Sequence, residues 1–442
     1  MAMPMMMNGN RKRTTMKKFI HNIYLLAALF LTATACTNED TALDSSAVEK
    51  EQPIIKTYTM TVNASKGEDI ATTRDLALVG STLNSTWKTG ETVKVYNALS
   101  VELGTLTAQS DGPNTTLSGT LSGATISEDD ALTLKFHSPS YTTQTGTLEY
   151  IAANCDYAIA TVKVTAVSGG NVTTKAASFA NQQAIVKFTL KDKADNGATS
   201  LSASKLVVTV GANSYTITPA SANNELFVAI PGFSGQSITL NAIVGSKVYI
   251  YTKSGVAFTN SQYYTRGVQM THQGTIEIGK LIGQNGCVYD NAAAAETAGT
   301  TAAGMIAYVG NASDCTNGLA IALADEDGVK SLEGAKNAAK TKNETSLPVV
   351  GGTWRVPTKA DWEHMLTACG DSYDEPNWTT TGLRGKLQTV SADIVMGNSY
   401  WANTPSSSDN SYVLSFGNPT GAYFQGGIDN TEEHKVRAVL AF

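Results

Sequence analysis

Charged and aromatic residues are scarce in this sequence. They make up 16% and 7% of its 442 residues, and the formal net charge is −6. Residues 1–35 carry five positive charges and no negative one, so the remainder of the chain has a net charge of −11. Phosphate backbones and anionic lipid surfaces attract clustered lysine and arginine, which this acidic remainder lacks. We therefore expect neither nucleic acid nor anionic lipid as a partner.

Residue types suited to catalysis or metal binding are also few. The sequence has five cysteines and five histidines, with no Cys-x-x-Cys pair and no histidine at metal-site spacing from a cysteine. Glu363-His364 lacks the second histidine of a helical zinc motif. The sequence contains neither a Gly-x-Ser-x-Gly nucleophile elbow nor a phosphate-binding loop. We predict no enzymatic activity, no metal and no cofactor.

The N-terminal segment is typical of a targeting signal. Its apolar run, Ile23–Leu31, follows basic residues and is too short to span a bilayer as a helix. Ala33–Cys36 resembles a lipobox, although alanine stands where leucine is usual. We interpret residues 1–35 as a lipoprotein signal peptide and Cys36 as the lipidated residue, which tethers the chain to a membrane at least during transit. A simple secretory signal with a chance cysteine is the alternative.

The rest of the chain is long enough for several domains. Residues 36–53 are polar and acidic, as in a flexible tether. Between residues 54 and 273, short runs alternate apolar and polar residues and are separated by Gly, Asn and Ser turns, as half-buried strands are. Tyr58, Met60 and Val62 form one such run. The pattern predicts a mainly β chain with two β-sandwich domains, residues 54–175 and 176–273.

The C-terminal module, residues 274–442, combines helices with strands. It holds four of the five tryptophans. Thr358 and Asp361 form a capping-box pair at the start of a helix, and the following apolar residues recur at helical spacing: Trp362, Met365, Leu366 and Cys369. A second helix is expected over 331–340. Asp325–Asp327 is interpreted as a solvated acidic turn, and the tryptophans at 354, 362 and 401 as core.

The cysteines after Cys36 leave two possibilities open. Cys287, Cys315 and Cys369 all lie in the C-terminal module, so one disulfide there is possible in an exported protein, with three choices of pair. Buried free thiols are the other possibility. Cys155 lies apart from them in the sequence.

The stretch Ile54–Gln273 resembles the fimbrillin families, the lipoprotein pilins of type V pili. The resemblance is carried by Thr72-Thr73-Arg74, by the motif from Trp87 to Tyr96, by Gln144–Leu148, by Ile151–Tyr157 and by Gln183–Phe188. Cys155 stands where tyrosine is usual. The resemblance implies two transthyretin-like β-sandwiches in an outer-membrane or fimbrial protein exposed at the cell surface.

The same resemblance implies a processing step. In that family a first strand is cut away after a basic residue, and a strand from a neighbouring pilin subunit takes its place. Here the removable strand would be Ile54–Val62 and the cleavage point Arg74. An ordinary loop arginine, with the strand retained, is the alternative. Because a folded module follows the second sandwich, no free terminal strand is evident for donation, and we expect a tip subunit.

Gly318–Phe442 is similar to C-type-lectin-like modules shared by formylglycine-generating enzymes and many bacterial surface proteins. Leu319–Leu323, Trp354–Trp362, Tyr400–Thr404 and Val436–Val439 carry the similarity. The enzymes' cysteine pair is absent, since Cys369 stands alone. Glu375-Pro376-Asn377 copies a calcium-lectin motif without its Trp-Asn-Asp partner, and a plain turn is preferred to a calcium site.

Exposed aromatic side chains dominate binding hot spots, and on this ground we predict the ligand contacts Tyr373, Trp378, Tyr400 and Tyr423. The favoured function is a fimbrial tip adhesin whose module binds a host or bacterial surface protein or glycan. The alternative is an anchor pilin or membrane-anchored lipoprotein that binds such a ligand without polymerising. A surface enzyme is the third possibility, although the sequence offers no nucleophile.

Overall fold

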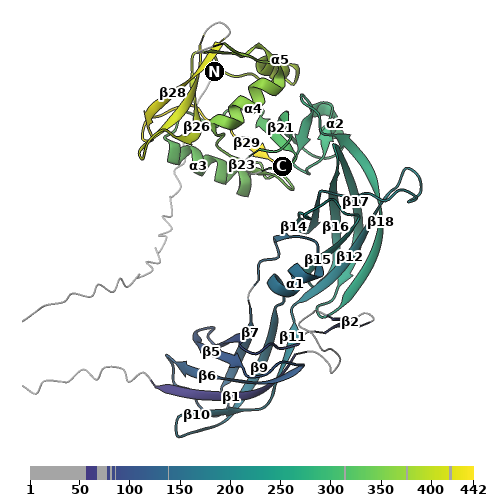
Figure 1. The fold of residues 1–442 in the computed structure, drawn as a ribbon, viewed down its shortest axis with the longest axis vertical. Helices are drawn as coiled ribbons and strands as arrows, with labels where there is room; N and C mark the ends of the chain where they lie inside the picture. The colour runs from purple at the N-terminus through teal and green to yellow at the C-terminus, as the bar shows by residue number, and fades with distance from the viewer. Residues whose placement is uncertain are drawn as a thin grey trace, which may run out of the picture. The chain divides into compact units, whose positions relative to one another are not determined.

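A computed structural model describes residues 56–66, 77–79, 82–84, 86–137, 139–312, 315–374, 377–417 and 421–442. The chain is mainly β, as predicted (Figure 1). The signal segment, Cys36, Ile54 and Arg74 lie outside the described residues. Within the described ranges, no helix combines the length and apolarity that crossing a membrane requires.

The first sheet closes on itself through its first strand. The strand order is β10-β1-β11-β9-β7-β4-β5-β6, and β1 also pairs with β6. A single closed circuit therefore replaces the separate face-to-face sheets that a sandwich would have. Inward residues of the alternating runs fill its core, Leu134 among them, as the sequence predicted for Met60. The strands are β1 Thr57–Lys66, β4 Thr92–Tyr96, β5 Glu102–Ala108, β6 Asn114–Ser122, β7 Ala131–Phe136, β9 Ala158–Ser168, β10 Asn171–Thr174 and β11 Ala177–Asn181; a separate hairpin joins β2 Ala77–Val79 to β3 Thr82–Asn84.

The second sheet has the order β15-β12-β18-β17-β16-β13-β14-β8. Its two halves share one core, with Phe188 and Leu226 from one and Leu206 and Leu240 from the other. The strands are β8 Thr143–Gln144, β12 Gln183–Asp192, β13 Lys205–Val210, β14 Asn213–Ile217, β15 Glu225–Pro231, β16 Phe233–Val244, β17 Lys247–Phe258 and β18 Tyr263–Thr275.

The predicted boundary between residues 175 and 176 does not separate the two sheets. β11 follows that boundary, yet it pairs with β1 and β9 of the first sheet. β8 and α1 (Leu148–Asn154) precede it, yet they pack with the second sheet. The buried amide of Gln144 fixes this crossing, because it donates to the Ala229 carbonyl at 2.8 Å and accepts from the Ala229 N–H at 2.9 Å. Local alternation cannot show which sheet a short strand joins.

The C-terminal module contains two further sheets, with orders β20-β19-β21-β22-β29-β23 and β24-β25-β28-β27-β26. Both predicted helices are present: α3 begins after the cap Ser331, and α4 after Thr358. The strands are β19 Leu281–Gly283, β20 Val288–Tyr289, β21 Ala302–Val309, β22 Gly318–Ala322, β23 Thr353–Arg355, β24 Tyr373–Asp374, β25 Asn377–Thr379, β26 Ser399–Pro405, β27 Asn410–Phe416, β28 Gly421–Asp429 and β29 Val439–Ala441. The helices are α2 Ala292–Thr297, α3 Leu332–Thr341, the π-helix η1 Lys342–Ser346, α4 Lys359–Cys369 and α5 Thr381–Thr389.

Candidate functional site

β1 is an internal strand, paired along both edges. On one edge it runs antiparallel to β6 from Thr57↔Ser122 to Ser65↔Asn114. On the other it runs parallel to β10 and then to β11. An internal strand satisfies the backbone N–H and C=O groups of both neighbours. Removing β1 would therefore expose two rows of unpaired groups on either side of one groove.

The side chains of β1 also fill the core of the first sheet. Met60 is 0% exposed, and Tyr58, Val62 and Ala64 are buried beside it. The Ile126 N–H donates to the Tyr58 hydroxyl at 3.2 Å. The alternate residues, such as Thr59, are exposed. The groove under β1 is therefore an apolar channel with pockets at alternate positions.

The described strand differs from the predicted segment Ile54–Val62. It begins at Thr57 and continues to Lys66, because Ala64 keeps the inward alternation and Ser65 still pairs with β6. A cavity of about 390 Å³ adjoins its C-terminal end, beside Asn63, Ser65 and the β6 residue Asn114. Arg74 lies in the chain between β1 and β2, outside the described residues.

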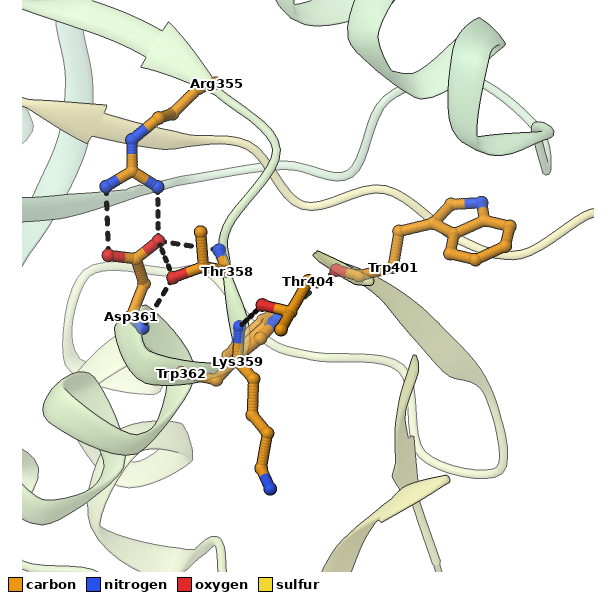
Figure 2. A network of polar contacts seen from close by, with 7 residues as sticks. All are labelled: Arg355, Thr358, Lys359, Asp361, Trp362, Trp401 and Thr404. Atoms are coloured by element: carbon orange, nitrogen blue, oxygen red, sulfur yellow. Dashed lines mark hydrogen bonds and ion pairs between the residues drawn. The ribbon is translucent and has the colours of Figure 1, made fainter. Parts of the chain in front are cut away.

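A network of hydrogen bonds and an ion pair surrounds the start of α4 (Figure 2). The Asp361 carboxylate accepts two hydrogen bonds from the Arg355 guanidinium, one of them at 2.9 Å. It also accepts from the N–H and hydroxyl of Thr358 at 2.6 and 2.7 Å. The Thr358 hydroxyl accepts from the Asp361 N–H in return, which completes the predicted capping box.

Burial alone would raise the pKa of Asp361. The hydrogen bonds from Arg355 and Thr358 outweigh burial, so the pKa lies below its ordinary value and the carboxylate stays ionised. The sequence pattern Trp-Arg-Val-Pro-Thr-Lys-Ala-Asp-Trp thus encodes an anchor that fixes β23 to α4.

Three tryptophans of the module, Trp354, Trp362 and Trp401, are buried in the core, as predicted. The Trp362 Nε1–H donates to the Trp401 carbonyl at 3.3 Å, and the Trp401 Nε1–H donates to the Lys330 carbonyl at 2.6 Å. The Lys359 N–H donates to the Thr404 hydroxyl at 2.9 Å (Figure 2). Two motifs about 40 residues apart in the sequence therefore meet in one structural unit.

The prediction that Tyr400 is an exposed contact residue is wrong. Tyr400 is 0% exposed, and its hydroxyl donates to Asp325 at 2.9 Å. Burial, together with the charge of Asp325, raises the pKa of Tyr400, so the phenol keeps the proton that it donates. The alternation of β26 places Tyr400 on the face that packs against Trp362 and Phe416.

The sequence indicated a solvated acidic turn at residues 325–327, but two of its carboxylates form ion pairs inside the module. Asp325 forms an ion pair at 2.6 Å with Arg437, which is 2% exposed. Glu326 forms one at 2.6 Å with Lys342, and both side chains are largely buried. The Arg437 guanidinium also donates to the Ala322 carbonyl at 2.9 Å. A run of carboxylates in a polar loop predicts a solvated turn, because the sequence does not show which distant cations the fold brings to it.

Two of the predicted contact aromatics lie together. Tyr373, which is 54% exposed, is directly opposite Trp378 in the β24–β25 ladder, and their ring centroids are 5.3 Å apart. Trp378 is half-buried and leans on the module core. Its partner in β28 is Ala422, so the neighbouring Tyr423, 43% exposed, points to the opposite face of the sheet. The structure therefore brings Tyr373 and Trp378 together and separates Tyr423 from them.

The calcium-lectin motif is only partly visible. Glu375 and Pro376 lie outside the described residues, whereas Asn377 is exposed at the start of β25. In its would-be partner segment, Trp401 and Ala402 belong to the core. In the part of the chain that the structure describes, no group of three His, Cys, Asp or Glu side chains is placed to hold a metal ion.

Cys155, Cys287 and Cys369 are buried, and Cys287 and Cys369 do not form a disulfide bond with each other. Cys287 accepts a hydrogen bond from Asn241 at 3.4 Å, and the Cys369 thiol donates to the Ala307 carbonyl at 3.6 Å. Burial raises the pKa of Cys287 to about 11 and those of Cys155 and Cys369 to about 12. These three thiols therefore stay protonated at neutral pH, which suits packing and not nucleophilic attack.

Sequence reasoning missed one further anchor. Asp371 is buried, and its carboxylate accepts from the N–H groups of Gly382 at 2.7 Å and Leu383 at 2.8 Å. It thereby caps the N-terminus of α5, where Thr380 supplies no side-chain cap. A cap from about ten residues upstream has no signature in the sequence.

Comparisons with known proteins returned fimbrial structures at low similarity. No protein-family model matches the chain, and no curated protein does. A fimbrial protein from Bacteroides ovatus shares 12% identity with a TM-score of 0.32, over 88% of this chain and all of that one. A fimbrial assembly protein from Parabacteroides distasonis shares 14% sequence identity with a TM-score of 0.29, and the match covers 48% of this chain and 91% of that one. A shaft pilin from Lactobacillus rhamnosus shares 10% sequence identity with a TM-score of 0.22, and the match covers 50% of this chain and 100% of the pilin. At these TM-scores, the contacts of the chain itself must carry the argument for function.

Proposed function

We propose that this protein is an exported adhesive subunit of a cell-surface fimbria, lipidated at Cys36 during transit. Cleavage after Arg74 would release β1, and a strand from a neighbouring subunit would take its place. The observation that carries the proposal is that β1, the first described strand, is paired on both edges and supplies Met60 and three further buried side chains. A depression at the C-terminal end of β1, beside Asn63 and Ser65, would be the place where an incoming strand begins the exchange.

The pairing of the last described strand supports a position at the fimbrial tip. β29 lies between β22 and β23, and its residues are buried. Donating it would break two ladders and open the core of the C-terminal module. The subunit is therefore expected to accept a strand without donating this one, while a C-type-lectin-like module presents the ligand surface.

Limited digestion with an arginine-specific protease tests the proposal. We expect a first cut after Arg74, because Arg355 and Arg437 are held in buried networks, Arg384 is paired with Asp393, and Arg266 lies within strand β18. The cut protein should then take up a fluorescently labelled peptide of residues 57–66, released β1 being detected by mass spectrometry. Arg74→Gln is the matched control and should neither be cut there nor take up peptide. Cleavage at Arg74 without peptide uptake would refute strand exchange.

The alternative is a membrane-anchored lipoprotein that keeps β1. Its support is the same pairing of β1 on both edges, since a strand held in this way is also what a non-polymerising protein needs. Resistance at Arg74, with protected β1 amides in hydrogen exchange, would favour this alternative.

The ligand surface of the module is expected to include Tyr373 and Trp378. Tyr373→Ala and Trp378→Ala should each weaken binding to glycan or cell-surface preparations by about 1–2 kcal/mol or more, because paired aromatics contribute strongly to contact energy. Tyr423→Ala, on the opposite face of the sheet, is the control and should bind normally. Circular dichroism checks folding, and equal losses in all three variants would exclude a surface centred on the pair.

A further inference from the structure

In the second sheet, β17 and β18 pair over only part of their length. The two strands pair only from Lys247↔Thr275 to Ile250↔Thr271. Beyond that point β17 pairs with β16, and β18 pairs with β12. Among the described residues, no strand covers the facing edges of Tyr251–Phe258 and Tyr263–Met270. These two segments form what we call the β17–β18 gap.

A cavity of about 280 Å³ occupies the gap. Core residues Phe188, Ile238 and Val268 form its floor, and the half-buried side chains of Tyr251 and Val256 line its wall. The cavity is therefore lined by apolar side chains and bounded by the edges of two strands. Unpaired backbone N–H and C=O groups beside an apolar space are what a sheet presents where one strand is missing.

Two glycines keep the rim of the gap free of side chains. Gly255 on β17 and Gly267 on β18 both line the cavity, and a Cβ atom at either would meet no atom within 4 Å. The bare backbone on the rim permits another backbone to approach closely. Among the described residues, nothing packed around Gly267 requires glycine, and its backbone has ordinary strand geometry, whereas Gly255 has a φ of +67°, which by itself favours glycine.

The rim is also positively charged. Lys253 and Arg266 both line the cavity and are exposed. The Arg266 guanidinium stacks 5.1 Å from the Tyr264 ring and donates to the Thr265 carbonyl at 2.9 Å. Within the described ranges, neither cation has a carboxylate at ion-pair distance. The charge is therefore available to a partner.

We propose that the β17–β18 gap binds, by strand addition, an extended segment of another polypeptide with apolar side chains at alternate positions and carboxylates between them. The free strand edges call for a backbone partner, which a glycan or small molecule cannot supply. The cavity calls for apolar side chains every second residue. Lys253 and Arg266 call for carboxylates on the solvent side, where charge complementarity selects the partner. This site is separate from the groove of β1.

The test uses the intact, uncleaved chain with β1 in place, so its outcome does not depend on processing at Arg74. The probe is a fluorescein-labelled octapeptide of alternating valine and glutamate, titrated by fluorescence anisotropy at low salt. We expect saturable binding that the double variant Lys253→Glu, Arg266→Glu weakens at least tenfold. Lys247→Glu, at the paired end of the same strand, is the matched control and should bind normally.

Charge reversal in the peptide sharpens the test. A valine–lysine octapeptide should bind the double variant better than it binds the unaltered chain. Equal binding of a block peptide with four valines followed by four glutamates would overturn the proposal, as would absence of binding or unchanged affinity in the double variant. Self-association of the chain that the double variant abolishes would assign the gap to a second copy and overturn the acidic-peptide partner.

Discussion

The Met60→Asp variant is expected to lose the native pairing of β1. Met60 is 0% exposed and lies opposite Gly119 in the β1–β6 ladder. A carboxylate there would be buried without a partner, at a cost on the order of 5 kcal/mol, which is comparable to the whole stability of many domains. Hydrogen exchange measured by mass spectrometry should show fast exchange throughout β1, β6 and β11.

Thr59→Asp is the matched control for this prediction. Thr59 is the adjacent residue on the exposed side of the same strand, and the same charge there can remain hydrated. In this variant the amides of β1, β6 and β11 should stay protected, with a change in the free energy of unfolding of no more than about 0.5 kcal/mol, as for an ordinary surface substitution. The C-terminal module should be unaffected in both variants. Protection of β6 and β11 that survives Met60→Asp would show that β1 does not hold the first sheet together.

The Asp361→Ala variant is expected to destabilise the C-terminal module by about 3–5 kcal/mol. The substitution removes the carboxylate that accepts two hydrogen bonds from the largely buried Arg355, and it removes the capping box of α4. Urea unfolding followed by tryptophan fluorescence reports mainly on this module, because four of the five tryptophans lie in it. The transition assigned to the module should move to lower urea concentration.

Glu363→Ala is the control in the same helix. Its ion pair with Lys359, at 3.9 Å, is solvent-exposed and should contribute less than about 1 kcal/mol. A module transition that is the same in Asp361→Ala and Glu363→Ala would contradict the anchor role of Asp361.

The stability of the module is also expected to depend on pH through Asp361. The pKa of Asp361 is lowered in the folded state. Its contribution is therefore complete above the unfolded-state pKa of about 3.9 and is lost as pH falls through the lower folded pKa. Asp361→Ala removes this contribution, so its unfolding midpoint should fall less on acidification than that of the unaltered chain. An equal acid dependence in both proteins would assign the effect to other carboxylates.

The sequence by itself determined the features that depend on near neighbours. The inward side of β1 follows from the alternation of Tyr58, Met60 and Val62, since successive side chains of a strand point to opposite faces. The beginning and the buried face of α4 follow from Thr358, Asp361 and helical spacing. Both features are set within a few residues, which is the range over which backbone geometry repeats.

Only the tertiary structure decided which segments meet. It pairs β1 on both edges, places Gln144 in the second sheet, buries Tyr400 against Asp325 and leaves the β17–β18 gap open. Each of these depends on contacts between residues far apart in the chain, and a polar or aromatic side chain has the same local pattern whether its partner is water or a distant residue. Burial of such a group becomes favourable only when the fold supplies its hydrogen-bond partner. The sequence therefore identified the strands and the helix, and the assembled fold decided their partners.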